Sequence, residues 1–112
     1  MVLQKDGEEL DQLFRALSDS TRRSMLRRLA QRPMTVGELA EPFDMAKPSF
    51  SRHVKVLERA SLLRREVDGR LHHCHLEAGP LRGGMDWLRY YEKFWNSQFD
   101  ALERHLASGD GS

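Results

Sequence analysis

Residues 47–59, near the middle of the chain, are crowded with side chains that donate hydrogen bonds. Together with one residue further along, the candidates are Lys47, Ser49, Ser51, Arg52, His53, Lys55 and Arg70. Arg and Lys are the usual donors to guanine O6 and N7, and all of these residue types donate to phosphate oxygens. Each residue taken alone also fits a solvated helix surface. The cluster as a whole favours a DNA duplex as the partner.

These donors have different expected roles. If residues 47–59 form a helix, its first turn and a half is the part that enters a DNA groove. The residues expected to face bases are Lys47, Ser51 and Arg52, with Ser49 beside them. Those expected at phosphates or the groove edge are His53 and Lys55, and Arg70 is expected at a phosphate or in the adjacent minor groove.

A second candidate site is a run of four potential metal ligands, His72, His73, Cys74 and His75. Zinc binds such nitrogen and sulfur donors, usually four at a time. On a β-strand, however, His72 and Cys74 point to one face while His73 and His75 point to the other. At most two of them could reach one ion without help from a second subunit. Strand packing or proximity to DNA is the preferred interpretation, and no metal or other cofactor is predicted.

Cys74 is the only cysteine in the chain. It cannot form an internal disulfide, which fits a reducing compartment, and it lacks a resolving partner for a redox switch. The sequence also contains no glycine-rich phosphate loop, no serine elbow and no pair of carboxylates in a predicted cleft. Enzyme activity is therefore not predicted.

Hydrophobic periodicity predicts the helices that position these donors. A first helix within residues 1–17 is indicated by apolar residues at i, i+3, i+4 and i+7, namely Leu10, Leu13, Phe14 and Leu17. A second, arginine-rich helix ends before Pro33. A third begins at Thr35, where Glu38 completes the pattern of a capping box. The fourth begins near Pro48, because proline is tolerated in a first helical turn. Its buried stripe is expected to be Phe50, Val54 and Leu57.

The third and fourth helices, within residues 35–61, have the pattern of a helix-turn-helix whose second helix lies in the DNA major groove. Phe43 and Met45 lie in the turn and are expected to fill the space between the two helices. Residues 63–76 predict two strands around a two-residue Asp-Gly turn. A hairpin directly after a recognition helix is the wing of a winged helix. The predicted fold is mostly α with a small β-hairpin, a winged helix-turn-helix in a single domain spanning 1–112.

A last helix is predicted for residues 85–106, after a segment that contains Gly79, Pro80 and the Gly83-Gly84 pair. It carries six of the nine aromatic residues, over an arc too wide for one small domain to bury. A second copy of the chain is the favoured cover, and a core helix of a single subunit is the alternative. The residues expected at a dimer interface are Leu10, Leu13, Phe14, Trp87, Tyr91, Phe94, Trp95, Phe99 and Leu102. Residues 107–112 are expected to form a flexible tail.

The distribution of charge supports the same interpretation. The chain has 112 residues and a net charge of +1, which suits one compact domain. Residues 22–75 carry 12 Lys and Arg against 6 Asp and Glu, a net charge of +6, whereas residues 1–21 and 76–112 are acidic at −3 and −2. A basic middle between acidic ends suits phosphate binding through one face. No apolar run approaches the ~20 residues of a membrane span, and the start lacks a signal-peptide pattern, so a cytoplasmic location without membrane contact is expected.

From Leu13 to Leu76 the chain resembles the ArsR family of dimeric winged-helix transcriptional repressors. LFRALSDSTRR is similar to the family's opening L-x-x-L-[SA]-D-x-[TS]-R-R, and SRHVKVLERASLL is similar to its S-x-H-L-K-x-L-x-x-A-G-L. The tail DWLRYYEKFWNSQFDALERHL resembles one branch with an aromatic-rich final helix. The resemblance implies a homodimer built from the first and last helices. It also implies that two recognition helices bind an inverted-repeat operator in double-stranded DNA.

The chain departs from the family pattern at several positions. Metal-sensing members carry the cysteine motif E-L-C-V-C in the third helix, where residues 38–42 read ELAEP. Others use Asp/His and His/Glu pairs in the last helix, where only Asp86 and His105 are available, far apart. The resemblance thus implies a member without these metal sites. In addition, Ala46 replaces the usual Ser that opens the recognition helix, and Ser61 stands where Gly is usual.

A second hypothesis keeps the fold and changes the function. The same elements suit a winged-helix module that dimerises or binds a partner protein and does not touch DNA. Such modules usually sit at the end of longer enzymes, and they have no need of Lys47 and Arg52 at the groove-facing end of a helix. Neither hypothesis predicts the operator sequence, the regulated genes or an inducing signal.

Overall fold

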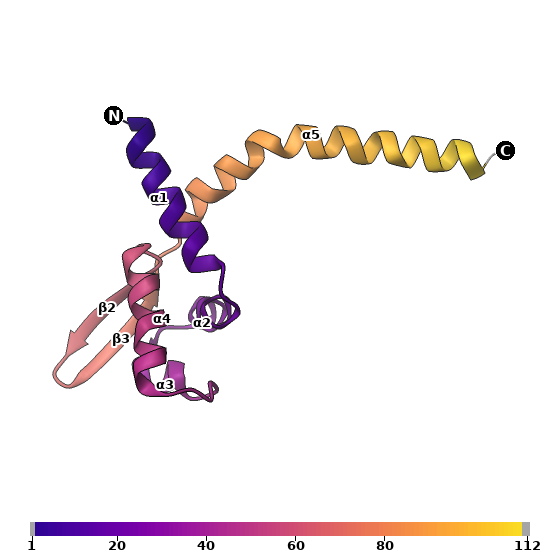
Figure 1. The fold of residues 1–112 in the computed structure, drawn as a ribbon. Coiled ribbons are helices and arrows are strands. Elements are labelled where there is room, and N and C mark those ends of the chain that lie inside the picture. The colour runs from indigo at the N-terminus through magenta and orange to yellow at the C-terminus, as the bar shows by residue number, and fades with distance from the viewer. Residues whose placement is uncertain (1, 111–112) are drawn as a thin grey trace.

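The computed structural model describes the backbone of residues 2–110 and the side chains of residues 7–107. Its elements, in chain order, are α1 (Val2–Leu17), α2 (Ser20–Gln31), β1 (Met34–Thr35), α3 (Val36–Ala40), α4 (Lys47–Arg59), β2 (Leu63–Asp68), β3 (Leu71–Leu76) and α5 (Gly79–Asp110). Helices α1–α4 and the small sheet form a body from which α5 extends as a long rod (Figure 1). This arrangement is the winged helix-turn-helix predicted from the sequence.

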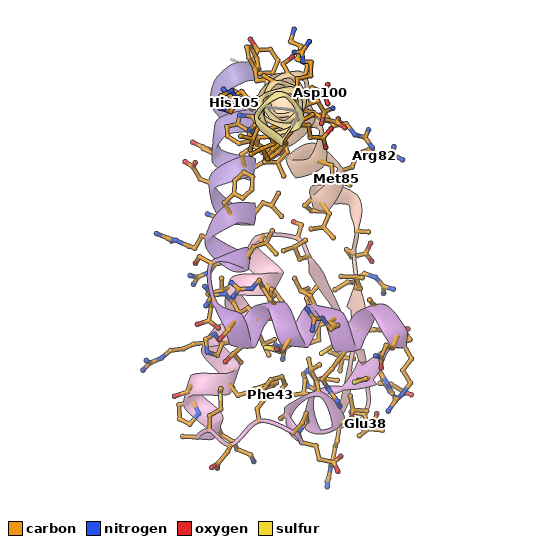
Figure 2. All side chains as sticks on the ribbon, turned by 90° about the vertical axis from the view of Figure 1, so that its right-hand side faces the viewer. Glu38, Phe43, Arg82, Met85, Asp100 and His105 are labelled. Atoms are coloured by element: carbon orange, nitrogen blue, oxygen red, sulfur yellow. The ribbon has the colours of Figure 1, made fainter. Side chains whose placement is uncertain are left out.

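One apolar core lies between the helices and the sheet. Phe14, part of the predicted stripe of the first helix, is 37% exposed and does not belong to this core. The predicted apolar residues that the core does contain include Leu13, Met25, Leu26, Leu29, Leu39, Phe50, Val54 and Leu57. Phe43 and Met45, in the turn between α3 and α4, pack against this core as expected. The ring centroids of Phe43 and Phe50 lie 5.9 Å apart. Figure 2 labels Phe43 in this turn, where its ring helps to fix α3 against α4.

The predicted capping box is present at the start of α3. The backbone N–H of Glu38 donates to Thr35 Oγ1 over 3.1 Å, and the backbone N–H of Thr35 donates to Glu38 Oε1 over 3.0 Å. The hydrogen bond from the Thr35 backbone is the main cause that lowers the pKa of the Glu38 carboxyl. Arg28 Nη2 also donates to the Glu38 carbonyl over 3.0 Å. A helix of only five residues is thereby held at both its start and its side.

Helix α4 has a weak start and a well-formed end. Its N-cap is Ala46, which makes no side-chain hydrogen bond to the helix. At the other end the Leu62 N–H donates to the Leu57 carbonyl over 3.0 Å and the Ser61 N–H donates to the Glu58 carbonyl over 2.9 Å. These two bonds define a Schellman motif, and Ser61 has the positive φ of 58° that the motif needs. Glycine adopts this conformation with the least strain.

Replacing Ser61 with glycine is therefore expected to stabilise the fold by about 1 kcal/mol, because the strain of a left-handed serine exceeds the extra entropy that glycine loses. Urea unfolding measures the difference. The same change at Ser51, an exposed position inside α4, serves as the control and is expected to cost about 0.5 kcal/mol of helix propensity. Equal effects at the two positions would contradict this account of Ser61.

The predicted hairpin is present, with its turn one residue later than expected. Strands β2 and β3 pair antiparallel, with Leu63 opposite Leu76 and Asp68 opposite Leu71. The two loop residues are thus Gly69 and Arg70, so the prediction of an Asp68-Gly69 turn is wrong by one position. Gly69 has a φ of 63°, as the first residue of a type II′ turn requires. The shift places Arg70 at the tip of the wing.

A third strand was not predicted. β1 pairs antiparallel with β3, with Met34 opposite Cys74, which gives the sheet order β1-β3-β2. Two residues are too few to show the alternating pattern by which strands are recognised in a sequence. The pairing ties the start of the helix-turn-helix to the wing.

Helix α5 is longer than predicted at both ends. It begins at Gly79, six residues before Met85, and continues to Asp110. Residues 107–110, assigned to a flexible tail, are therefore helical, and residues 111–112 of that tail lie outside the described residues. Pro80 is compatible with a first helical turn, where its missing N–H is not needed. The glycine pair at 83–84 lies within the helix and does not separate it from the wing.

Gly84 lies where α5 crosses α1. A Cβ added at Gly84 would lie 2.5 Å from Leu13 Cδ2, whereas one added at Gly83 meets nothing within 4 Å. Leu13 is only 2% exposed, so its side chain has little room to move. We expect Gly83→Ala to stabilise the fold by about 1 kcal/mol through helix propensity. Gly84→Ala is expected to lower stability by about 1 kcal/mol, because overpacking outweighs the same gain. Urea unfolding measures the free energy of unfolding of both variants, and we expect an increase for Gly83→Ala and a decrease for Gly84→Ala.

Most of α5 is not covered by the rest of the chain. Trp87, near its start, contacts Phe14 of α1 edge to face, with ring centroids 5.7 Å apart. Further along, the helix projects away from the body (Figure 1), and its large apolar side chains are exposed, including Tyr90, Phe94, Trp95, Phe99, Leu102 and Leu106. None of the described helices combines the length and the apolar character needed to cross a membrane.

Candidate nucleic-acid interface

The exposed face of α4 carries most of the predicted donors. Phe50, Val54 and Leu57 of this helix are buried in the core. The exposed residues are Lys47, Ser49, Ser51, Arg52 and Lys55. Within the described part of the chain, none of these five side chains forms an ion pair or a hydrogen bond with another residue. Their donors are thus directed to solvent.

Arg70 and the start of α4 lie toward the same end of the molecule. Figure 1 shows the tip of the β2–β3 hairpin and the region of α3 together at the end of the body opposite the junction of α1 with α5. Arg70 is exposed at this tip. The geometry therefore separates a basic end, with the recognition helix and the wing, from an aromatic end that carries α5.

His53 lies differently from the other donors of α4. Its side chain is 20% exposed, and its Nδ1 lies 3.1 Å from Arg22 Nη1 and 3.8 Å from Asp19 Oδ2. The ring is therefore directed toward α2. Asp19 is also the N-cap of α2, where its Oδ2 accepts a hydrogen bond from the Arg22 backbone N–H over 3.1 Å. Burial raises the pKa of the Asp19 carboxyl, but this hydrogen bond and the charge of Arg22 outweigh that effect, and the pKa is lowered.

Arg65 of β2 connects α4 to the wing, a role that the sequence did not reveal. Its Nη2 donates to Glu58 Oε1 over 2.8 Å, and its Nη1 lies 3.3 Å from His72 Nδ1. These contacts join the last turn of α4 to both strands of the hairpin. Arg65 and Glu66 are neighbours in a strand rich in charged residues, and nothing in this pattern indicates that Arg65 points toward α4.

The His72–His75 run is divided between the two faces of β3. Cys74 is fully buried, and burial raises the pKa of its thiol. His72 lies on the same face beside Arg65, whereas His75 Nε2 lies 3.2 Å from Glu66 Oε2 on the other face. No group of three or more His, Cys, Asp or Glu side chains among the described residues is close enough to hold a metal ion. Since the thiolate is the reactive form, Cys74 is poorly placed for redox chemistry.

The two potential ligands of the last helix are also apart. Asp86 and His105 are nineteen residues apart along α5, about 28 Å at the rise of an α-helix. Figure 2 views this helix nearly end-on and labels His105 and Asp100 on its distal part, beyond the body. Within one described subunit, Asp86 and His105 therefore cannot share an ion.

Comparisons with known proteins agree with this geometry. A family model described as a helix-turn-helix domain matches residues 17–66. The transcriptional repressor SdpR of Bacillus subtilis is 33% identical over 79 residues, which cover 70% of this chain and 88% of that protein. The HTH-type transcriptional regulator Rv2034 of Mycobacterium tuberculosis is 45% identical over 53 residues, 47% of this chain and 50% of that one. A crystal structure of an ArsR family transcriptional regulator superimposes with a TM-score of 0.76 at 43% identity, covering 81% of this chain and 94% of that chain.

The fold and these relatives define a DNA-binding transcriptional regulator of the winged-helix class. The chain belongs to the ArsR family. The relatives named above are transcriptional regulators.

Proposed function

We propose that this protein is a homodimeric repressor that binds an inverted-repeat operator in double-stranded DNA. The observation that carries the proposal is the separation of two surfaces on one chain. Exposed donors lie at one end of the body, and the exposed aromatic residues of α5 extend from the other end. A dimer formed through α1 and α5 leaves both recognition helices free to reach successive major grooves, about 34 Å apart. Such a regulator acts in the cytoplasm, where it has access to the DNA.

The proposed contacts follow from exposure and position. Lys47, Ser51 and Arg52 face bases, with Ser49 beside them, because they occupy the exposed first turns of α4. Lys55 and Arg70 contact phosphates. For His53 only the other ring nitrogen, Nε2, is available for a contact with DNA, because Nδ1 already contacts Arg22 of α2. The dimer contacts are made by exposed or half-buried residues, Leu10 and Phe14 of α1 and Trp87, Tyr91, Phe94, Trp95, Phe99 and Leu102 of α5. The prediction of Leu13 at this interface is wrong, because its side chain is 2% exposed and is packed in the core of its own subunit.

The test is to select operator sequences from a random duplex pool with the purified protein and to measure binding by gel shift. DNA upstream of its own gene is included as a candidate operator. A dimer in sedimentation, bound to a selected inverted repeat, is the expected result. If the protein binds no selected duplex more tightly than random DNA, the hypothesis of a protein-binding module is the better one.

The proposed phosphate contact of Arg70 can be tested through the salt dependence of DNA binding. Arg70→Ala is expected to weaken binding to every sequence alike and to reduce the slope of log affinity against log salt by about 1, as the loss of one phosphate contact should. Arg82→Ala removes the same charge from an exposed position on α5, at the other end of the molecule (Figure 2), and is expected to leave the slope unchanged. Titrations at four salt concentrations measure both slopes. An unchanged slope for Arg70→Ala would exclude the phosphate contact.

A further inference from the structure

The side chain of Arg22 joins three helices. It lies in the first turn of α2, where its Nε donates to the Ala16 carbonyl and its Nη2 donates to the Arg15 carbonyl, each over 2.8 Å. These carbonyls belong to the last turn of α1, where the helical N–H partners four residues further on are missing. The Arg15 carbonyl also accepts hydrogen bonds from the Ser18 backbone N–H over 3.2 Å and from Ser18 Oγ over 2.6 Å. Arg22 therefore fixes the end of α1, the helix that the proposed function places in the dimer interface.

The remaining terminal nitrogen of the same guanidinium reaches the recognition helix. Nη1 lies 3.1 Å from Nδ1 of His53, on α4. A neutral imidazole with its proton on Nε2 accepts this hydrogen bond at Nδ1. Asp19 fixes the backbone of Arg22, because its Oδ2 accepts a hydrogen bond from the Arg22 N–H over 3.1 Å at the start of α2.

An arginine is well suited to such a connection. Its guanidinium is planar and presents its donors in a fixed fork, so that the direction of one hydrogen bond constrains the others. Rotation of α4 relative to the end of α1 would break the bond to His53 or those to Arg15 and Ala16.

We propose that Arg22 is a positioning residue that sets the orientation of the recognition helix relative to α1, and thereby the spacing between the two recognition helices of the dimer. The proposal rests on the proposed function, because the spacing exists only in a dimer built through α1. In this arrangement Arg22 does not contact DNA. It acts through His53 on the distance between operator half-sites that the dimer accepts.

The experiment measures binding to operators whose half-sites are moved closer together or further apart by one base pair. Each step changes the separation by about 3.4 Å and the relative rotation by about 35°. The wild-type protein is expected to lose at least about tenfold in affinity at either altered spacing. Arg22→Gln is expected to bind the preferred operator about tenfold more weakly and to differ by less than about threefold among the three spacings.

Arg23 offers a matched control. Its Nη1 donates to the Leu17 carbonyl over 2.7 Å, so it also binds the end of α1 from the first turns of α2. Among the described residues it makes no hydrogen bond to α4. Arg23→Gln removes the same charge and the same type of bond. It is expected to keep the spacing preference of the wild type.

Two changes at His53 test the connection independently, including the case in which Arg22→Gln does not fold. His53→Ala is expected to relax the spacing preference, and His53→Asn is expected to restore most of it, because the amide oxygen can accept the Arg22 bond in place of Nδ1. The double variant Arg22→Gln with His53→Ala should be no worse than the more severe single variant.

The outcomes separate this inference from the function on which it rests. If the wild type does not bind an operator as a dimer, the proposed function fails. If it does, and the Arg22 and His53 variants keep a sharp spacing preference, only the positioning role fails. A decrease of about 1 in the salt slope of Arg22→Gln would also overturn it, since that result identifies a direct phosphate contact.

Discussion

Replacing Trp95 and Phe99 with serine is expected to convert the protein into a monomer that no longer binds its operator at micromolar concentration. Both side chains are exposed on the part of α5 that projects beyond the body. Full burial of an exposed aromatic side chain contributes about 1.5–3 kcal/mol, and Trp95 and Phe99 are 46% and 63% exposed, so an interface adds about half of that for each. Twofold symmetry removes four of them at once, about 3–6 kcal/mol in total. A loss at the lower end already weakens dimerisation by about 10².

Sedimentation equilibrium and a gel shift on the same samples give the result. The control is Asn96→Ser with Asp100→Ser, two exposed positions on the polar side of the same helix, where the number of introduced serines is identical. We expect the control to stay dimeric and to bind the operator. A wild-type protein that sediments as a monomer at micromolar concentration would contradict both the dimer and the operator geometry derived from it.

Arg52→Ala is expected to cost about 1–3 kcal/mol of specific binding and to relax the preference for one base pair in each half-site. The physical reason is the loss of a guanidinium that can donate two parallel hydrogen bonds to guanine O6 and N7. Non-specific binding should change much less. The measurement compares affinities for the operator and for a set of operators with single base-pair substitutions.

Arg59 provides the control for Arg52, since it is an exposed arginine of the same helix at the end remote from the groove-entering turns. Arg59→Ala removes the same charge without a predicted base contact, and its discrimination among operators should match the wild type. Unchanged discrimination in Arg52→Ala would show that the recognition face of α4 had been assigned to the wrong residues.

The helices and the core were predictable because they depend on local patterns. Apolar residues at helical spacing specified the buried faces of α1 and α4, down to Leu13 and Val54. The capping box of Thr35 and Glu38 was predictable for the same reason, since its two hydrogen bonds join residues three apart. The positive φ of Ser61 explains in physical terms why a glycine is usual at that position.

Errors occurred where longer-range packing overrides local preference. Gly83 and Gly84 suggested a break, yet the close approach of Gly84 to Leu13 makes glycine the residue that lets α5 continue past α1. The turn of the wing follows from the pairing of Asp68 with Leu71, which a single Asp-Gly dipeptide does not determine. The two-residue strand β1 exists only because β3 lies beside it.

The residues of the candidate site could be predicted from the sequence, whereas the partners that their side chains contact could not. A basic cluster can be counted in a sequence, but the partner of each side chain depends on contacts between distant residues. His53 and Arg22 are 31 positions apart, and Arg65 meets Glu58 only because the hairpin folds against α4. The two arginines that hold the recognition helix in place were therefore not among the predicted site residues.

The sheet order β1-β3-β2 has a consequence for how copies of the chain meet. Its outer strands are β1, of only two residues, and β2, which carries the exposed charged residues Arg64, Glu66 and Asp68. Charged or very short edges discourage another chain from extending a sheet. Two copies of the chain are therefore discouraged from pairing through the edges of their sheets, a mode of association that can add further chains indefinitely. In the proposed dimer the aromatic residues of α5 make the contact instead, and a twofold contact is complete once two chains have met.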